Sequence, residues 1–254
     1  MSTDNLYTLS TDQISSLSTA QIAKLTTNQV VALTTDQVAN LSTAQVLALT
    51  SKQIAAIETS DMMVMSTDQM VSLSTLQIIN LSSDQVQSLT SKQISNLTTI
   101  QLSSFKTAQL ASMETGDLQA ITTAQITSLT TSQIASLTTD QALALTTVQL
   151  NNLKTSQIAR LTTAQLIALG TDQIANLMTS QLVALTTAQI AAMETADLIA
   201  ITTSNISSLT TAQVAALTSL QVSSLTTAQV TALSTKQLVA IETLDLSSMS
   251  TTQV

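Results

Sequence analysis

The chain has 254 residues, of which 44% are hydrophobic, but aromatic residues make up only 1%, Gly occurs twice and Pro is absent. This composition argues against a conventional large core and against simple disorder, because small aliphatic side chains can still be buried against one another. The formal net charge of −8 removes the basic surface that nucleic acid or an anionic membrane would require, so neither is expected as a partner.

Two residue types that carry much of protein chemistry are missing, because the chain contains neither Cys nor His. Their absence removes disulfides, thiolate metal sites, the commonest general base and the usual zinc and haem ligands, so we expect no enzymatic activity and no cofactor. The longest apolar runs, such as residues 62–65, are far shorter than the roughly 20 residues of a membrane-spanning helix, and residues 1–7 lack a classical secretory signal.

A large apolar residue recurs every eight residues from Leu9 and Leu17 to Met249, without an insertion. We name this position slot one and number the other seven slots of the repeat after it. Slot six carries a second apolar series through Ile14 and Ile22, in which Ala142 is the small exception. Slot three is always Ser or Thr and slot five is mostly Gln, so the unit reads L-(T/S)-(T/S)-x-Q-(I/V/L)-x-x and defines a repeat protein.

The spacing of the apolar slots predicts one short helix per repeat. Slot six and the next slot one are three residues apart, which fits a helix face and not the alternation of a strand. One continuous helix is also excluded, since eight residues rotate the apolar stripe by about 80° per repeat. A Ser or Thr hydroxyl can start a new helix in each repeat by accepting a bond from a free N–H group of the first turn.

Two slots could provide this cap. The spacing from Ser18 in slot two to Gln21 in slot five is that of a capping box. We favour slot three, because slot two also holds Glu, Lys, Gly and Met whereas slot three never loses its hydroxyl. Thr19 would then cap a helix from Ala20 to about Leu25, and the Gln amide would be free to bond carbonyls at the bends of a neighbouring coil.

Helices this short are unstable alone, so neighbours must stabilise them. We expect an all-α solenoid of about one-turn helices, one per eight-residue repeat, that covers residues 1–254 as an elongated rod without a linker or capping repeats. Large apolar residues at slot four recur at multiples of 24 residues and those at slot seven at 16, so the number of repeats per turn stays open. Exposed ends would imply either a longer protein or end-to-end self-association into filaments.

Four repeats replace the usual residues by Glu at slot two together with Asp at slot five. They are IETSD (57–61), METGD (113–117), METAD (193–197) and IETLD (241–245). The two changes are coupled, and a long Glu with a short Asp conserves the combined reach of Thr and Gln across the joint. We therefore interpret the pairs as a structural exchange, with no metal, catalytic or cofactor-binding residue; the pairs are Glu58 and Asp61, Glu114 and Asp117, Glu194 and Asp197, and Glu242 and Asp245.

Two alternatives involve binding. Each acidic pair could bind Ca²⁺, although two carboxylates supply too few of the six to eight oxygens that the ion takes. The regularly spaced Thr pairs, such as Thr130 and Thr131, could form a surface for ice or glycan, although capping and bend formation explain them locally.

The unit LTTAQ(I/V)AAL, as in LTTAQIAAM (185–193) and LTTAQVAAL (209–217), resembles octapeptide arrays of large bacterial surface or secreted proteins that are often labelled haem-utilisation or adhesion proteins. The resemblance implies a non-enzymatic scaffold, a rod, stalk or filament subunit, at the cell surface or in extracellular matrix. It identifies no functional residue and leaves any surface ligand unknown.

Overall fold

The structure is a computed structural model, and it describes residues 6–241, 243–247, 249–251 and 253. The chain divides into two compact units, Met1–Leu129 and Thr130–Val254, which we describe separately. The expectation of a single rod over residues 1–254 therefore stays a prediction.

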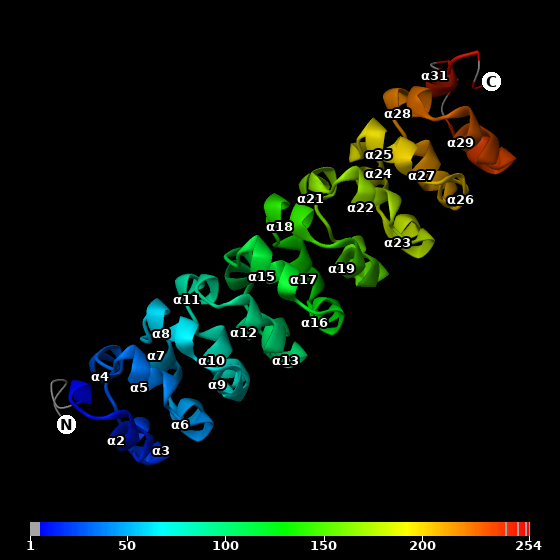
Figure 1. The fold of residues 1–254 in the computed structure, drawn as a ribbon. Helices are drawn as coiled ribbons and strands as arrows, with labels where there is room; N and C mark the ends of the chain where they lie inside the picture. Colours follow the sequence, from blue (N-terminus) through cyan, green and yellow to red (C-terminus); the bar gives the residue numbers. More distant parts are fainter. Residues whose placement is uncertain (1–5, 242, 248, 252, 254) are drawn as a thin grey trace. The chain divides into compact units, whose positions relative to one another are not determined.

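In the first unit, each octad contributes one helix of four to six residues (Figure 1). The helices are α2 (Thr11–Ser15), α3 (Thr19–Ile22), α4 (Thr27–Val31), α5 (Thr35–Ala39), α6 (Thr43–Ala48), α7 (Ser51–Ile54), α8 (Thr59–Val64), α9 (Thr67–Ser72), α10 (Thr75–Ile79), α11 (Ser83–Gln87), α12 (Ser91–Asn96), α13 (Thr99–Ser103), α14 (Thr107–Ala111), α15 (Thr115–Ala120) and α16 (Thr123–Ser128).

The second unit repeats the same element. Its helices are α17 (Thr131–Ala135), α18 (Thr139–Ala144), α19 (Thr147–Asn152), α20 (Thr155–Ile158), α21 (Thr163–Ala168), α22 (Thr171–Ala175), α23 (Thr179–Ala184), α24 (Thr187–Ala192), α25 (Thr195–Ala200), α26 (Thr203–Ile206), α27 (Thr211–Ala215), α28 (Ser219–Ser224), α29 (Thr227–Ala232), α30 (Thr235–Ala240) and α31 (Thr243–Leu246). The described residues contain no strand, so the predicted fold class, an all-α solenoid of very short helices, is confirmed in each unit.

The joint between two helices consists of slots one and two in an extended conformation. Leu49 has φ −60° and ψ 134°, and Thr50 has φ −69° and ψ 159°. The slot-one N–H still donates to the slot-six carbonyl, as Leu49 does to Val46 at 3.2 Å, so the helix closes before the chain extends. An interruption in every octad keeps slots six and one on the inner side, which a continuous helix could not do.

The helix start corrects the sequence-based prediction by one residue. The cap is Ser18 in slot two, whose hydroxyl accepts the Gln21 N–H at 3.3 Å, and not Thr19. The Gln21 side chain accepts the Ser18 N–H at 2.8 Å in return, which completes a capping box. Helix α3 therefore covers Thr19–Ile22 and not the predicted range from Ala20 to Leu25.

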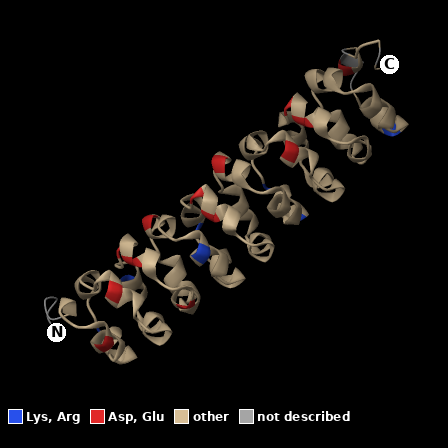
Figure 2. Ribbon diagram, in the orientation of Figure 1, with Lys and Arg blue, Asp and Glu red and all other residues tan. Residues whose placement is uncertain are grey.

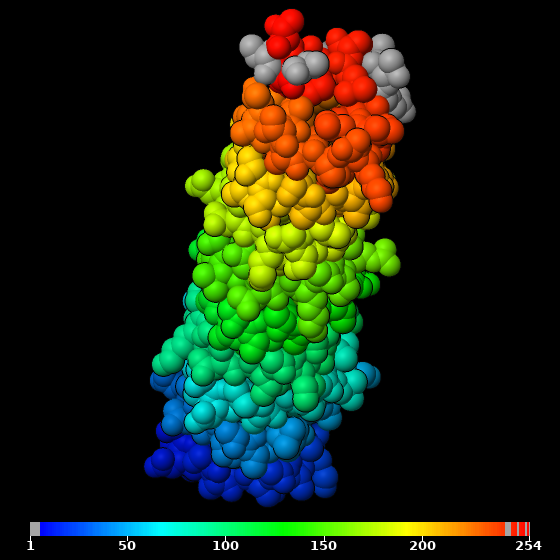
Figure 3. Space-filling model, turned by 90° about the vertical axis from the view of Figure 1, so that its right-hand side faces the viewer, coloured from blue at the N-terminus to red at the C-terminus, as the bar shows by residue number. Residues whose placement is uncertain are grey.

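Successive turns stack so that each helix packs on the helix three octads earlier, as α9 does on α6 and α12 on α9. Hydrogen bonds between turns join residues 26 to 31 positions apart, so a turn contains between three and four octads. In each unit the surface colours of Figure 3 change in chain order, as expected for stacked turns. The 24-residue recurrence at slot four is therefore only near the true turn length.

The interior of each unit is a narrow aliphatic core formed by the two apolar slots. Slot-six residues such as Ile78 and Ile190 are 0% exposed, and slot-one residues such as Leu73 are about as fully buried. Ala142 is also fully buried, which shows that the core accepts a small residue at this slot. Removing each large side chain from water contributes about 1.5–3 kcal/mol, the stabilisation that isolated one-turn helices lack.

None of the helices that the structure describes is long and apolar enough to cross a membrane.

Candidate functional site

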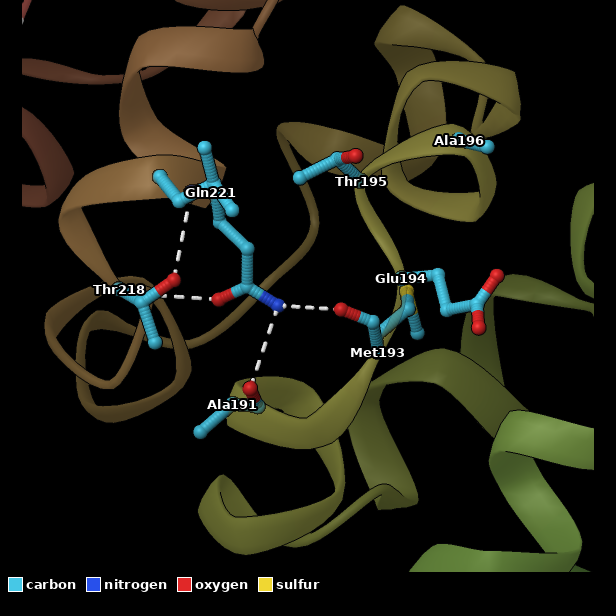
Figure 4. Close-up of a pocket in the computed structure, with 8 residues that line it drawn as sticks. Ala191, Met193, Glu194, Thr195, Ala196, Thr218 and Gln221 are labelled. Carbon is cyan, nitrogen blue, oxygen red and sulfur yellow. Dashed lines mark hydrogen bonds between the residues drawn. The ribbon is translucent and has the colours of Figure 1, made fainter.

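The slot-five glutamine is the most connected polar side chain of the repeat. In Figure 4, Gln221 accepts the Thr218 N–H through Oε1 at 2.9 Å, while its own N–H donates to the Thr218 hydroxyl at 3.2 Å. Its Nε2 donates to the carbonyls of Met193 at 2.7 Å and Ile190 at 2.9 Å, which belong to the preceding turn. One side chain therefore caps its own helix and binds the turn beneath it.

The same arrangement recurs in the first unit. Gln77 is 2% exposed, and its Nε2 donates to the carbonyls of Leu49 at 2.8 Å and Val46 at 2.9 Å, which lie 28 and 31 residues earlier. The Val46 carbonyl already accepts the Leu49 N–H and takes the amide as a second donor, whereas the Leu49 carbonyl lies in the joint after the helix and has no intrahelical donor. The predicted bond from the Gln amide to a neighbouring coil is confirmed. The same side chain also takes part in the capping box of its own helix, because its Oε1 accepts the Ser74 N–H.

Slot two tolerates residues without a hydroxyl because half of the capping box remains. Lys106, Gly170 and Met178 make no side-chain cap bond. Their backbone N–H groups still donate to the slot-five Gln, at 2.6, 2.7 and 3.0 Å respectively. Slot two can therefore vary because its backbone N–H keeps the bond to Gln whatever its side chain is. This variability is no evidence against slot two as the cap.

A surface hollow of about 380 Å³ lies beside Gln221 between two turns, lined by Met193, Glu194, Thr218 and Leu220 among others. Glu194 is the ionisable residue of this lining, and its carboxylate points away from the Gln221 amide (Figure 4). The hollow lies beside the bond by which the Gln221 amide joins the two turns.

The acidic repeats use a different hydrogen bond between turns. Glu58 is the N-terminal cap residue of α8 but makes no side-chain cap bond, and it is exposed. Asp61 is 2% exposed and is hydrogen-bonded to the slot-three hydroxyl of Thr35 in the preceding turn. The exchange of reach between Glu and Asp that we predicted across the joint is therefore wrong, because Asp bonds to another turn and Glu turns to solvent.

The other acidic repeats follow this pattern. Asp117 accepts the Ser91 hydroxyl at 2.6 Å, Asp197 accepts the Thr171 hydroxyl at 2.8 Å, and Asp245 accepts the Ser219 hydroxyl. Glu114 and Glu194 are exposed without a cap bond, and Glu242 lies outside the described residues. The prediction that these positions bind no metal stays a prediction, although the described residues hold no group of three or more potential ligands of the His, Cys, Asp and Glu types.

Burial makes the ionised form of these aspartates costly. It raises the pKa of the Asp61, Asp117 and Asp197 carboxyls, the bonds from the slot-three hydroxyls lower it in part, and the neighbouring Glu raises it further. An ionised Asp also lacks the donor that Gln offers to the joint below. Accordingly, the Leu33 carbonyl, which lies 28 residues before Asp61, accepts no hydrogen bond from any described residue.

Asn205, which occupies slot five in its octad, combines the hydrogen bond made by the slot-five Asp with one made by the slot-five Gln. Its Oδ1 accepts the Thr179 hydroxyl at 2.7 Å, as an Asp would, and its Nδ2 donates to the Leu177 carbonyl at 3.4 Å, as a Gln would. The bond from the slot-three hydroxyl could not be identified from the sequence, because its 26-residue span follows from the number of octads per turn.

The octad matches a known family model. The model of the ALTTAQ repeat matches residues 1–27, 9–43, 27–59, 54–91, 110–147, 144–179 and 190–227, which together cover more than half of the chain. The chain belongs to the ALTTAQ repeat family. The letters ALTTAQ occur in this chain at residues 184–189, which include the slot-two hydroxyl of Thr186 and the slot-five Gln189 of one capping box.

No protein with a curated description matches this ALTTAQ repeat chain. Among solved structures, it is similar to the leucine-rich repeat-containing protein LegL7 from Legionella pneumophila, with 11% identity and a TM-score of 0.27 over 92% of this chain and 79% of that chain. Both values are too low to imply a shared function.

Proposed function

We propose that the chain is a non-enzymatic structural scaffold, a spacer in a bacterial surface or extracellular protein of the adhesin type. The observation that carries the proposal is the double use of the slot-five glutamine. At Gln77 and Gln221 the defining residue of the octad is consumed by contacts within the chain, and it offers no buried donor or acceptor to a substrate. Contacts of this kind hold successive turns together, which is what a spacer requires.

Membership of a repeat-array family also favours a scaffold over an enzyme. The surface location is supported by the resemblance of the octad to arrays in large bacterial surface and secreted proteins. Labelling of intact cells of the source bacterium with an antibody to the repeat would test this location, and labelling only after lysis would contradict it.

The scaffold role is tested by removing one octad. Deleting residues 66–73 joins Met65 to Ser74 in phase, so that Gln77 would reach the Leu41 carbonyl in place of that of Leu49. We expect a folded, helical protein whose maximum dimension by small-angle X-ray scattering is slightly smaller than that of the parent chain.

The matched control deletes only residues 66–69. It removes fewer residues but places every later octad out of phase with those before it, so the slot-five amides no longer meet slot-one carbonyls. We expect this shorter deletion to lower the midpoint of thermal unfolding more than the longer one. If both deletions lower the midpoint of thermal unfolding equally, the repeats do not act as interchangeable spacers.

The alternative, a repetitive surface for Ca²⁺, ice or glycan, stays a prediction. For Ca²⁺ the informative variant is Glu58→Thr together with Asp61→Gln, which restores the common octad at α8. If Ca²⁺ raises the melting temperature of the parent chain but not that of this variant, the result favours an ion-binding role over the scaffold role.

A further inference from the structure

The acidic octads leave a buried backbone carbonyl without a donor. In an octad with Gln, the slot-one carbonyl 28 residues earlier accepts the Gln amide, as the Leu49 carbonyl accepts Gln77 Nε2 at 2.8 Å. The equivalent carbonyls beneath the acidic octads accept no hydrogen bond from any described residue; they are those of Leu33, Leu89 and Leu169. These three leucines are at most 5% exposed, so each unpaired carbonyl carries a desolvation cost.

The aspartate above each of these carbonyls is buried as well, and one of its two oxygens is already bonded. Asp117 is 6% exposed and its Oδ1 accepts the Ser91 hydroxyl at 2.6 Å, while Asp197 is 3% exposed and its Oδ1 accepts the Thr171 hydroxyl at 2.8 Å. Oδ2 is then the polar atom of the side chain that is left for the turn beneath. An ionised carboxylate has no proton to donate, so it cannot pair with a carbonyl.

Asn205 shows where the second polar atom of such a side chain lies. Asn has the same shape as Asp, and the Oδ1 of Asn205 accepts the Thr179 hydroxyl at 2.7 Å across the same 26-residue span. Its Nδ2 donates at the same time to the Leu177 carbonyl, 28 residues earlier, at 3.4 Å. A slot-five side chain of this length therefore reaches both partners, and an Asp lacks only the hydrogen that protonation of Oδ2 would supply.

We propose that each of these aspartates makes a proton-controlled contact between turns, in which the protonated Oδ2 donates to the slot-one carbonyl 28 residues earlier. For Asp197 the acceptor is the Leu169 carbonyl. The protonated side chain makes both bonds that Asn205 makes, whereas the ionised side chain keeps only the bond from the slot-three hydroxyl. Gln does not titrate, so a change of pH acts at the acidic octads of a unit and leaves the Gln octads between them unchanged.

The surroundings of Asp197 favour uptake of the proton. Burial raises the pKa of its carboxyl, the bond from the Thr171 hydroxyl lowers it in part, and the nearby Glu194 raises it further. The carboxyl is therefore protonated below this raised pKa and loses its proton as pH rises through it. The contact closes on acidification and opens toward neutral pH.

The helices packed against the acidic helices bring few other ionisable groups. Apart from the slot-two Glu of each acidic octad, these groups all lie at slot four and are exposed. They are Asp36 of α5 and Asp84 of α11 beside α8, Lys92 of α12 beside α15, and Asp172 of α22 beside α25, while α28, which also packs on α25, has none. At Asp197, the groups whose titration must be separated from its own are therefore Glu194 and Asp172.

The contact at Asp197 can be observed by itself, because Leu169 is followed by Gly170 and this Leu–Gly pair occurs once in the sequence. Labelling Leu carbonyls with ¹³C and Gly nitrogens with ¹⁵N gives one carbonyl–nitrogen correlation in the NMR spectrum, from this peptide bond. We expect the Leu169 carbonyl signal to move downfield as pH is lowered from neutrality, since the carbonyl gains a donor. The midpoint should lie above 3.8, the ordinary pKa of Asp.

Three variants assign the titration to one carboxyl. Asp197→Asn carries a donor at every pH, so its Leu169 signal should not depend on pH and should lie near the acidic position of the parent. Asp172→Asn removes the exposed carboxyl three residues after Leu169 and should leave the titration as in the parent. Glu194→Gln should keep the titration but lower its midpoint, because Glu194 raises the pKa of Asp197. Circular dichroism checks that each variant is folded.

The proposal is overturned if the Leu169 carbonyl signal of the parent does not move with pH, or if it moves equally in Asp197→Asn. It is also overturned if the signal follows added Na⁺ or Ca²⁺ at constant neutral pH and does not follow pH, because a cation would then occupy the place of the proton. None of these results affects the octad deletions, which test the scaffold role separately.

Discussion

The slot-five glutamine joins two levels of structure with one amide group. Gln53 accepts the Thr50 N–H at 2.7 Å and donates to the carbonyls of Leu25 at 2.7 Å and Ile22 at 2.9 Å. A buried amide whose oxygen and nitrogen are both engaged avoids the desolvation cost of an unpaired polar group. Its geometry therefore fixes both where a helix starts and which turn it lies on.

The position of the cap is tested by two adjacent threonines of α24. The Thr186 hydroxyl accepts the Gln189 N–H at 3.2 Å, whereas Thr187 is the first helical residue. We expect Thr186→Val to lower the free energy of unfolding by about 1 kcal/mol, and Thr187→Val to lower it by clearly less, as measured by chemical denaturation. A larger loss of unfolding free energy for Thr187→Val would show that slot three provides the cap.

The buried aspartates make stability depend on pH. Because their folded-state pKa is raised, the native state binds protons more tightly than the unfolded state, so stability falls as pH rises through the folded-state pKa. We expect the melting temperature to rise as pH is lowered from neutrality toward the ordinary pKa of Asp, since the cost of the buried charge is then relieved.

The control for this effect replaces Asp61, Asp117 and Asp197 together by Asn. Asn205 shows that an amide at this slot keeps the bond from the slot-three hydroxyl and adds a donor to the joint below. We expect the triple variant to melt above the parent at neutral pH and to lose the rise on acidification. An unchanged pH profile would show that these carboxyls are not the cause.

At the scale of the helix, stability comes from the contact between turns and not from the helix itself. Elements of four to six residues gain too few internal bonds to offset nucleation. Each is therefore supported from outside by its capping box, by burial of slots six and one, and by the amide bonds to the turn before it.

The contribution of these amide bonds to stability can be measured by replacing Gln by Glu at a buried and at an exposed slot five. Gln77→Glu keeps the oxygen of the capping box but places a carboxylate against the carbonyls of Val46 and Leu49. We expect it to cost about 1–3 kcal/mol of unfolding free energy, the penalty for leaving buried groups unpaired. Gln13→Glu, at an exposed position in the first turn, should cost far less under dilute conditions.

Much of the helical element could be predicted from the octad. The three-residue spacing from Ile22 to Leu25 excluded a strand, and the drift of an eight-residue period excluded a long helix. The predicted helix start was wrong by one residue, because the hydroxyl that slot three always carries, as at Thr19, suggested that this slot is the cap. In the acidic repeats the same slot supplies a bond to another turn, as from Ser91 to Asp117, and a local pattern cannot reveal that partner.

At the scale of the molecule, each unit is a series of similar contacts between neighbouring turns, so its stability is close to a sum of repeat and interface contributions. Lys and Arg are few, and acidic residues are spread over each unit (Figure 2). Among the acidic residues, the slot-five aspartates such as Asp117 and Asp197 enter the contacts between turns. The number of octads per turn, which the sequence left open, is set where the slot-five amide meets carbonyls 28 and 31 residues earlier.

The central claim, that the slot-five amide binds the preceding turn, is tested most directly by the hydrogen exchange of Gln side-chain amides in NMR spectra. We expect the Nε2 protons of Gln77, which are bonded to Val46 and Leu49, to exchange far more slowly than those of Gln13, which have no acceptor among the described residues. Equal and rapid exchange at the two glutamines would contradict the claim.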